Sequence, residues 1–308
     1  IEGEDLLMLR PRRRAMLLGT CLALTTLLLP AGAMAGSPRD LLPDLRMAKP
    51  SDIRLQGATE DDPRRLLRFS AVILNVGRGP LIVRGKRDCD TSACPRMRTT
   101  QRIKESDGTT RGVASNGVGK FDVGDGHNHW HVMKFQRYEL FQLEPPPEEP
   151  GEAIRGAKTG FCFFDTEARQ LGLPGAPQRP QFGEPDCGRS NSTSFRMGLS
   201  VGWGDLYAWY LPRQWIDTTG IADGRYLLCS TANAERHWQE TDTSNNQAWA
   251  EIDLEGDTVQ VLRSGRSACS TQLPATPPEA GDEGDAGDMV TALEPSARQA
   301  TAGVPGGA

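Results

Sequence analysis

Short apolar runs separated by turns rich in Gly and Pro dominate the chain. The clearest run spans residues 66–76 and is closed by a Gly-Arg-Gly-Pro turn, which predicts a buried strand, a turn and a second strand at 81–84. Similar patterns predict strands at 127–141, 161–164, 225–231, 247–254 and 258–263. No stretch sustains helical periodicity beyond about two turns. The pattern therefore predicts a mainly β protein, an antiparallel β-sandwich with long loops and few short helices.

The two ends of the chain differ from the middle. Residues 10–29 combine four arginines with an apolar run, and Ala33-Met34-Ala35 resembles a cleavage sequence, so residues 1–35 are predicted to be a signal peptide with an upstream extension. Both general and twin-arginine export remain open, and Cys21 leaves a lipoprotein anchor as an alternative. Residues 272–308 carry six acidic residues and one arginine, without aromatic residues, which predicts a disordered acidic tail.

Charge and cysteine content narrow the class of protein. A net charge of −5 excludes a generally basic nucleic-acid binder. The sequence contains no HExxH or P-loop motif, so those classes of enzyme have no support. Six cysteines remain once Cys21 is removed, which in an exported chain indicates three disulfides. Several pairings are possible, and the short loop between Cys89 and Cys94 favours a local bridge.

Three of the four histidines occupy alternate positions, at His127, His129 and His131. Residues i, i+2 and i+4 of a β-strand point to the same face, so a strand here would hold the three imidazoles side by side. Neutral imidazoles without a neighbouring thiolate suit Cu(II) or Zn(II). A surface strand with scattered polar residues is the alternative, but so few histidines rarely fall together by chance. The sequence therefore predicts a metal site on this strand.

Seven sequence blocks occur in an order typical of one family. They are Leu42-Pro43-Asp44-Leu45, residues 64–70, the histidine strand, residues 156–162 (Gly-Ala-Lys-Thr-Gly-Phe-Cys), residues 202–207 (Gly-Trp-Gly-Asp-Leu-Tyr), residues 214–217 (Gln-Trp-Ile-Asp), and residues 240–246 (Glu-Thr-Asp-Thr-Ser-Asn-Asn). Together these blocks resemble the catalytic domain of the lysyl oxidases, copper amine oxidases of the extracellular space. The resemblance extends from about Leu42 to Cys269 and would make residues 36–271 a catalytic domain.

The resemblance implies roles for individual residues. His127, His129 and His131 match the copper ligands, and Lys158 and Tyr207 match the two residues that form lysine tyrosylquinone, an organic cofactor. Without the resemblance, Lys158 would be read as a solvated surface lysine and Tyr207 as a core or rim tyrosine. A calcium site is also implied, with the ligands Asp44, the Leu45 carbonyl, Glu240, Asp242, Asn245 and Asn246. An Asx-rich turn capped by its own backbone is the alternative to calcium.

Several positions depart from the family pattern. Cysteines of the family are replaced by Gly126, Trp203 and Arg213, and a histidine beyond the copper strand is replaced by Arg137. The reduced set of cysteines supports the bridges Cys89–Cys94, Cys162–Cys187 and Cys229–Cys269. Cys229 has no counterpart in the family, so its pairing is the least supported of the three.

The resemblance implies a secreted or cell-surface amine oxidase that uses Cu(II), lysine tyrosylquinone and Ca²⁺. Its substrates would be primary amines, either lysyl side chains of extracellular proteins or small amines. Molecular oxygen would be the oxidant, and an aldehyde, H₂O₂ and ammonia the products. No nucleic-acid partner is expected, and no membrane contact after signal cleavage. The alternatives are a non-catalytic secreted copper-binding module, which would lack the quinone, and a zinc-dependent hydrolase, which would differ in its metal.

Overall fold

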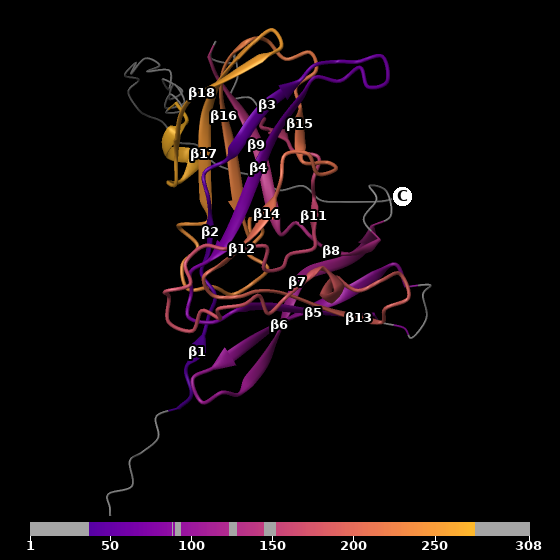
Figure 1. Cartoon of the computed structure of the whole chain (residues 1–308), viewed down its shortest axis with the longest axis vertical. Helices are drawn as coiled ribbons and strands as arrows, with labels where there is room; N and C mark the ends of the chain where they lie inside the picture. Colours follow the sequence, from indigo (N-terminus) through magenta and orange to yellow (C-terminus); the bar gives the residue numbers. More distant parts are fainter. Residues whose placement is uncertain (1–36, 88, 90–93, 123–127, 145–151, 275–308) are drawn as a thin grey trace, which may run out of the picture. The chain divides into compact units, whose positions relative to one another are not determined.

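The computed structural model describes residues 37–87, 89, 94–122, 128–144 and 152–274. The predicted signal peptide, most of the predicted acidic tail and His127 lie outside these residues. The chain divides into two units, Ile1–Ser37 and Pro38–Ala308, and the second contains all the strands described below. Its described part is antiparallel β structure (Figure 1), with two short 3₁₀ turns, η1 (Glu184–Cys187) and η2 (Cys269–Gln272). The predicted mainly β class is confirmed.

Among the described residues, no helix is long and apolar enough to cross a membrane.

The first sheet contains seven strands in the order β11-β8-β7-β6-β5-β13, with β1 paired to β6. They are β1 (Asp40–Leu41), β5 (Leu81–Arg87), β6 (Arg96–Glu105), β7 (Thr110–Asp122), β8 (His129–Met133), β11 (Gly160–Phe161) and β13 (Ser194–Leu199). The apolar pattern does not predict β6, although its side chains alternate strictly between exposed and buried along Arg96–Thr99. The reason is that its buried face includes Thr99 and Gln101 beside Met97 and Ile103, so that burial and hydrophobicity do not coincide.

The second sheet has five strands in the order β10-β9-β16-β17-β18. They are β9 (Gln136–Glu144), β10 (Ile154–Arg155), β16 (Gly224–Ala232), β17 (Gln247–Glu255) and β18 (Thr258–Gly265). The last three agree closely with predicted strands, because alternating apolar residues and a Glu-Gly-Asp turn set their limits.

The third sheet is organised around β4 (Leu66–Asn75), which is buried along most of its length. Its other strands are β2 (Leu45–Met47), β3 (Ser51–Gln56), β12 (Glu167–Ala168), β14 (Trp203–Tyr207) and β15 (Trp215–Asp217). β2 and β3 pair with one edge of β4, and β14 and β15 pair with the other. Because β4 is paired along both edges and covered on both faces, nearly all of its side chains are buried, which explains the apolar run in the sequence.

The long strand predicted over 127–141 is wrong in its extent, because two strands of different sheets occupy this region. β8 ends at Met133 and β9 begins at Gln136. Lys134 between them has a left-handed φ of 59°, which turns the chain. The side chain of Phe135 is fully buried and stacks on Phe163 with ring centroids 4.3 Å apart. The turn therefore anchors the end of the histidine strand to the core.

All three predicted disulfides are confirmed, at Cys89–Cys94, Cys162–Cys187 and Cys229–Cys269. The main core joins all three sheets, since Phe69 of β4, Trp130 of β8 and Tyr226 of β16 are at most 1% exposed. A smaller cluster lies around Cys229–Cys269.

Candidate functional site

The histidine strand holds two imidazoles in close contact. His129 and His131 are separated by one residue on β8, and both are buried. Their Nε2 atoms lie 3.0 Å apart. A single metal ion about 2.0–2.1 Å from each nitrogen could bind both imidazoles at that spacing. The prediction that alternate histidines share one face is therefore met for these two residues.

Carboxylates lie behind both imidazoles. Glu184 Oε1 is 3.4 Å from Nδ1 of His129, and Asp122 Oδ2 is 3.5 Å from Nδ1 of His131. The Nη1 atom of Arg213 donates to the same Asp122 oxygen at 2.7 Å. A carboxylate near Nδ1 fixes the orientation of an imidazole whose Nε2 is free to bind a metal. Both histidines are thus arranged with their Nε2 atoms toward each other, and Arg213 positions one of the carboxylates.

The third predicted ligand, His127, lies outside the described residues. Within the described ranges, no group of three or more His, Cys, Asp and Glu side chains is arranged to hold a metal. The donor chemistry still fits copper, because two buried imidazoles converge and the sequence supplies a third, His127, two positions before His129.

Lys158 and Tyr207 lie together, although 49 positions separate them in the sequence. Tyr207 ends β14, and Lys158 lies in the loop that enters β11. The Nζ atom of Lys158 is 5.3 Å from the centroid of the Tyr207 ring, and both side chains are buried. Phe161 contacts both: its ring meets that of Tyr207 edge-on at 4.9 Å, and Nζ lies 5.4 Å from its centroid. The arrangement fits a covalent link between the two residues.

The loop that carries Lys158 leads into the strand that pairs with the histidine strand. β11 pairs with β8, with Phe161 opposite Val132 and Gly160 opposite Met133. A Cβ atom at Gly160 would lie 2.9 Å from Cβ of His131, so only glycine allows the strands to approach so closely. The glycine in the Gly-Phe-Cys block therefore serves to place the Lys158 loop against the histidine strand.

Asp205 is a site residue that the sequence reasoning missed. It precedes Tyr207 by two positions on β14, shares its face of the strand, and is 1% exposed. Burial raises the pKa of its carboxyl to about 8, although hydrogen bonding by Tyr207 and the Phe164 amide and the charge of Lys158 oppose the shift. The pKa of the Tyr207 phenol is raised well above its ordinary value, first by burial and then by the charge of Asp205. Its place in the Gly-Asp-Leu-Tyr block was the available signal.

The Oδ2 atom of Asp205 is buried and has no hydrogen-bond partner among the described residues. Buried polar atoms without partners are costly and are typical of functional sites. A cavity of about 140 Å³ opens beside Lys158 and Tyr138. The site therefore combines a nucleophilic amine, a phenol, a buried carboxyl and space for a small group.

We expect Asp205 to contribute a fall in the stability of the metal-free protein between about pH 4 and pH 8. The pKa of Asp205 is higher in the folded protein than its ordinary 3.8, so folding binds a proton in this range and stability is lost as the pH rises through about 8. Asp205→Asn should reduce this fall in melting temperature, and the exposed Asp61→Asn should leave it unchanged. Equal pH dependence in all three proteins would contradict a buried, protonated Asp205.

The Cys162–Cys187 disulfide connects the two halves of the site. The hydroxyl of Tyr207 donates to the Cys162 carbonyl at 2.9 Å. Cys187 belongs to η1, which also carries Glu184 beside His129. One covalent bridge therefore joins the hydrogen-bond acceptor of the tyrosine to the segment that orients a histidine.

Replacing Cys162 and Cys187 together by alanine should lower the free energy of unfolding by about 3 kcal/mol, because the bridge spans 25 positions. The matched control is the double alanine variant at Cys89 and Cys94, whose bridge spans only 5 positions. We expect this control to lose less stability, as measured by denaturant unfolding. A loss at Cys162–Cys187 no larger than in the control would contradict the prediction.

Most of the predicted calcium ligands are also brought together. Asp44 Oδ1 accepts a hydrogen bond from Asn245 at 2.8 Å, and Glu240 Oε1 accepts one from Asn246 at 2.8 Å. The amide of Leu45 donates to Glu240 Oε2 at 2.9 Å. Burial raises the pKa of Glu240, and Asp44 adds to that shift. The carboxylates of Asp44 and Glu240 thus accept hydrogen bonds from amide groups, and these bonds join the segment around residues 44–45 to residues 240–246.

Asp242, the remaining predicted calcium ligand, makes its hydrogen bonds within its own turn. Asp242 Oδ1 accepts hydrogen bonds from the amide and hydroxyl of Ser244, which is the arrangement of an Asx-type turn. The Oδ1 atoms of Asn245 and Asn246 are buried and have no partner among the described residues, so they are the oxygens free to bind a cation.

Comparison with known proteins agrees with this geometry. The family model for lysyl oxidase matches residues 82–264. Lysyl oxidase homolog 3A of Danio rerio is 27% identical over 198 residues, which cover 64% of this chain and 20% of that protein. Protein-lysine 6-oxidase of Rattus norvegicus is 29% identical over 164 residues, which cover 52% of this chain and 34% of that protein. The chain thus spans about a third or less of the length of these relatives. Since the family match covers more than half of its residues and includes the histidine strand, Lys158 and Tyr207, this chain belongs to the lysyl oxidase family.

Proposed function

We propose that this protein is a copper- and lysine tyrosylquinone-dependent amine oxidase. The observation that carries the proposal is the burial of Lys158 against the ring of Tyr207, in the loop that leads into the strand paired with β8, the strand of His129 and His131. The reaction would convert a primary amine, O₂ and water into an aldehyde, ammonia and H₂O₂. The amine carbon loses two electrons and the oxygen molecule gains them, so the reaction balances without another cofactor.

Lys158 and Tyr207 are the proposed precursors of the quinone. The bond would form between Nζ and a ring carbon, and the contact at 5.3 Å from the ring centroid supports this pairing. The hydrogen bond from the Tyr207 hydroxyl to the Cys162 carbonyl and the edge contact with Phe161 fix the ring. When bound, copper supplies the redox chemistry that oxidises the phenol and reduces oxygen. His129 and His131, together with His127, are the proposed ligands.

Asp205 is the proposed proton carrier. Its carboxyl interacts with Tyr207 and Lys158, and its Oδ2 atom has no hydrogen-bond partner among the described residues. With a pKa near 8, this group can both accept and release a proton close to neutral pH. It would take the phenolic proton of Tyr207 while the quinone forms, and later the proton from the substrate carbon.

Membership of the family supports a proposal for the substrate class and the place of action. Among its relatives is a protein-lysine 6-oxidase, and we propose lysyl side chains of extracellular proteins or small primary amines as substrates. A calcium ion held by Asp44, the Leu45 carbonyl, Glu240, Asp242, Asn245 and Asn246 would fasten residues 240–246 to the start of the domain. We propose a secreted or cell-surface location, consistent with the arginine-rich apolar segment at residues 10–29.

The decisive experiment loads the metal-free protein with Cu(II) in air and analyses its peptides by mass spectrometry. We expect one cross-linked species containing the Lys158 and Tyr207 peptides, reactivity with phenylhydrazine, and H₂O₂ release that depends on added amine. Separate, unmodified peptides in copper-loaded protein would favour the non-catalytic copper-binding module. Stoichiometric zinc without affinity for copper would favour the hydrolase.

A further inference from the structure

Strand β18 forms the outer edge of the second sheet. It pairs with β17 on one side, and no other strand in the described part of the chain pairs with its outer side. The edge strands β10 and β11 have two residues each, whereas β18 has eight. The six-residue edges β3 and β13 carry exposed arginines, Arg54 and Arg196, in their middle. Because the free N–H and C=O groups of an edge strand are a template for another strand, β18 offers the longest template in the fold as described.

The side chains of β18 give this edge little protection against pairing. The strand contains neither Lys nor Pro, and Arg263 is its one charged residue. Val261 is 46% exposed and Leu262 is 42% exposed, and these two residues are called the apolar pair below. Among the described residues, Tyr210 is the one other large hydrophobic side chain that is exposed. An edge with outward apolar side chains and few charges is suited to pairing with another strand.

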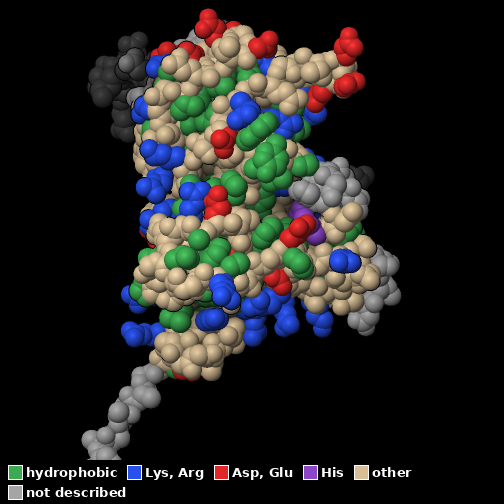
Figure 2. All heavy atoms as spheres, viewed as in Figure 1, with side chains coloured by type: hydrophobic (Ala, Val, Ile, Leu, Met, Phe, Trp, Pro, Cys, Tyr) green, Lys and Arg blue, Asp and Glu red, His purple; other side chains and the backbone are tan. Residues whose placement is uncertain are grey.

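The two ends of β18 carry opposite charges. Glu255 and Asp257 precede the strand, and Arg266 directly follows its last residue. All three side chains are exposed, and none of them forms an ion pair with another described residue. Figure 2 shows Asp and Glu side chains gathered at the end of the molecule where Figure 1 labels β18. At about 3.4 Å per residue, roughly 27 Å separate the acidic end of the strand from its basic end.

We propose that β18 pairs with β18 of a second copy of this chain in antiparallel orientation, so that the two second sheets become continuous. Antiparallel pairing places the acidic end of one strand beside the basic end of the other, at both ends of the contact. Parallel pairing would bring like charges together, which destabilises neighbouring strands. A two-fold axis through the middle of the contact uses the same edge in both copies, so the assembly closes as a dimer.

The charge pattern favours a second copy over the acidic end of the same chain. Residues 275–308 carry six acidic residues and a single base, Arg298. Such a segment would attract Arg266 but would repel Glu255 and Asp257 at the other end of the strand. The reversed β18 strand satisfies both ends at once, because its own polarity is the complement of the edge that it meets.

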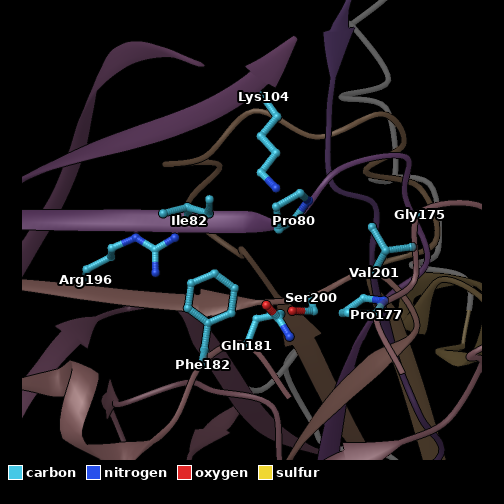
Figure 3. Close-up of a pocket in the computed structure, with 10 residues that line it drawn as sticks. All are labelled: Pro80, Ile82, Lys104, Gly175, Pro177, Gln181, Phe182, Arg196, Ser200 and Val201. Carbon is cyan, nitrogen blue, oxygen red and sulfur yellow. The ribbon is translucent and has the colours of Figure 1, made fainter. Parts of the chain in front are cut away.

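Insertion of the apolar pair into a pocket of a second copy would instead build an open chain of molecules. The pocket in Figure 3, of about 290 Å³, is the candidate for this contact because Ile82 and Phe182 line it. Lys104 and Arg196 line the same pocket, and Arg196 lies 4.7 Å from the centroid of the Phe182 ring. Its described lining contains no carboxylate, so aliphatic side chains would remove these cations from water without a compensating charge. The pairing of two edges is therefore favoured over an open chain.

Sedimentation velocity of the full chain over a wide range of concentrations tests the proposal. The wild type should pass from monomer to dimer as the concentration rises, without larger species. Val261→Lys/Leu262→Lys sets like charges against each other across the two-fold axis and should raise the dissociation constant by at least about tenfold. The matched control Tyr210→Lys replaces the remaining exposed hydrophobic side chain by the same charge and should dimerise as the wild type does. All three residues are exposed, so both variants should keep the melting temperature of the monomer.

Charge exchange tests the identity and the orientation of the partner. Glu255→Arg/Asp257→Arg and Arg266→Glu should each weaken dimerisation by about tenfold or more, because the symmetry repeats every repulsion at the other end. Mixed in equal amounts, the two variants should form a heterodimer in preference to either homodimer, because their ends are then complementary. The combined variant Glu255→Arg/Asp257→Arg/Arg266→Glu should dimerise again. Failure of the mixed variants to combine, or failure of the combined variant to recover, would overturn the proposal.

Hydrogen exchange of the unaltered protein locates the contact. Amides within residues 258–265 should exchange more slowly at high protein concentration, whereas those of the edge strand β13 should exchange at the same rate. A monomer at every concentration, or a dimer that persists in Val261→Lys/Leu262→Lys, would contradict pairing through β18. Growth of open chains would also contradict it, as would association seen only after removal of residues 275–308. None of these measurements depends on copper or amine oxidation, so the outcome is independent of the proposed enzyme activity.

Discussion

Replacing Tyr207 by phenylalanine should abolish amine-dependent H₂O₂ release and phenylhydrazine labelling, while copper remains bound. The substitution removes the phenol oxygen that must be oxidised, so no quinone can form on this ring. The fold should survive, because the ring contacts with Phe161 and Lys158 remain and the lost hydrogen bond to Cys162 costs about 1–3 kcal/mol. Copper content, peptide mass spectrometry and the oxidase assay measure the three expected outcomes separately.

The matched control is Tyr210→Phe, which removes a phenol that is 67% exposed three positions away. This variant should label and turn over as the wild type does. A complementary variant, Lys158→Arg, retains the positive charge but presents a guanidinium that stays protonated and is a poor nucleophile. It should bind copper and form no cross-link. Quinone labelling in Tyr207→Phe, or a cross-link in Lys158→Arg, would show that the cofactor is built from other residues.

Replacing His129 by alanine should remove copper and, as a consequence, the quinone. The Nε2 atoms of His129 and His131 are 3.0 Å apart, so the loss of either takes away one of two converging donors. Copper affinity should fall by more than the roughly 10–100-fold that is typical of losing a residue behind a ligand. Elemental analysis and electron spin resonance of the purified variant measure this directly.

His237→Ala provides the control for removing an imidazole. His237 is half-buried beside Trp238, with ring centroids 5.5 Å apart. It lies outside β8, the strand that carries His129 and His131. Copper content and turnover should be unchanged in this variant. The two His variants and Tyr207→Phe together separate loss of metal from loss of the organic cofactor, because only His129→Ala should lose both.

The sequence alone determined the class of fold and the chemical groups of the candidate site. Strands such as β4 and β16 were predictable because their burial coincides with apolar or alternating residues. The alternating histidines were informative because period-two spacing has a direct geometric meaning in a strand. Lys158 and Tyr207 have no such local signal, and only the resemblance of their flanking blocks to the lysyl oxidases predicted them.

Tertiary structure decided what depends on contacts between distant segments. It placed β8 and β9, which share the strand predicted over 127–141, in two different sheets, because Lys134 adopts a left-handed turn and Phe135 enters the core. It also buried Asp205 beside Tyr207, and burial, which sequence does not specify, is what raises the pKa of that carboxyl.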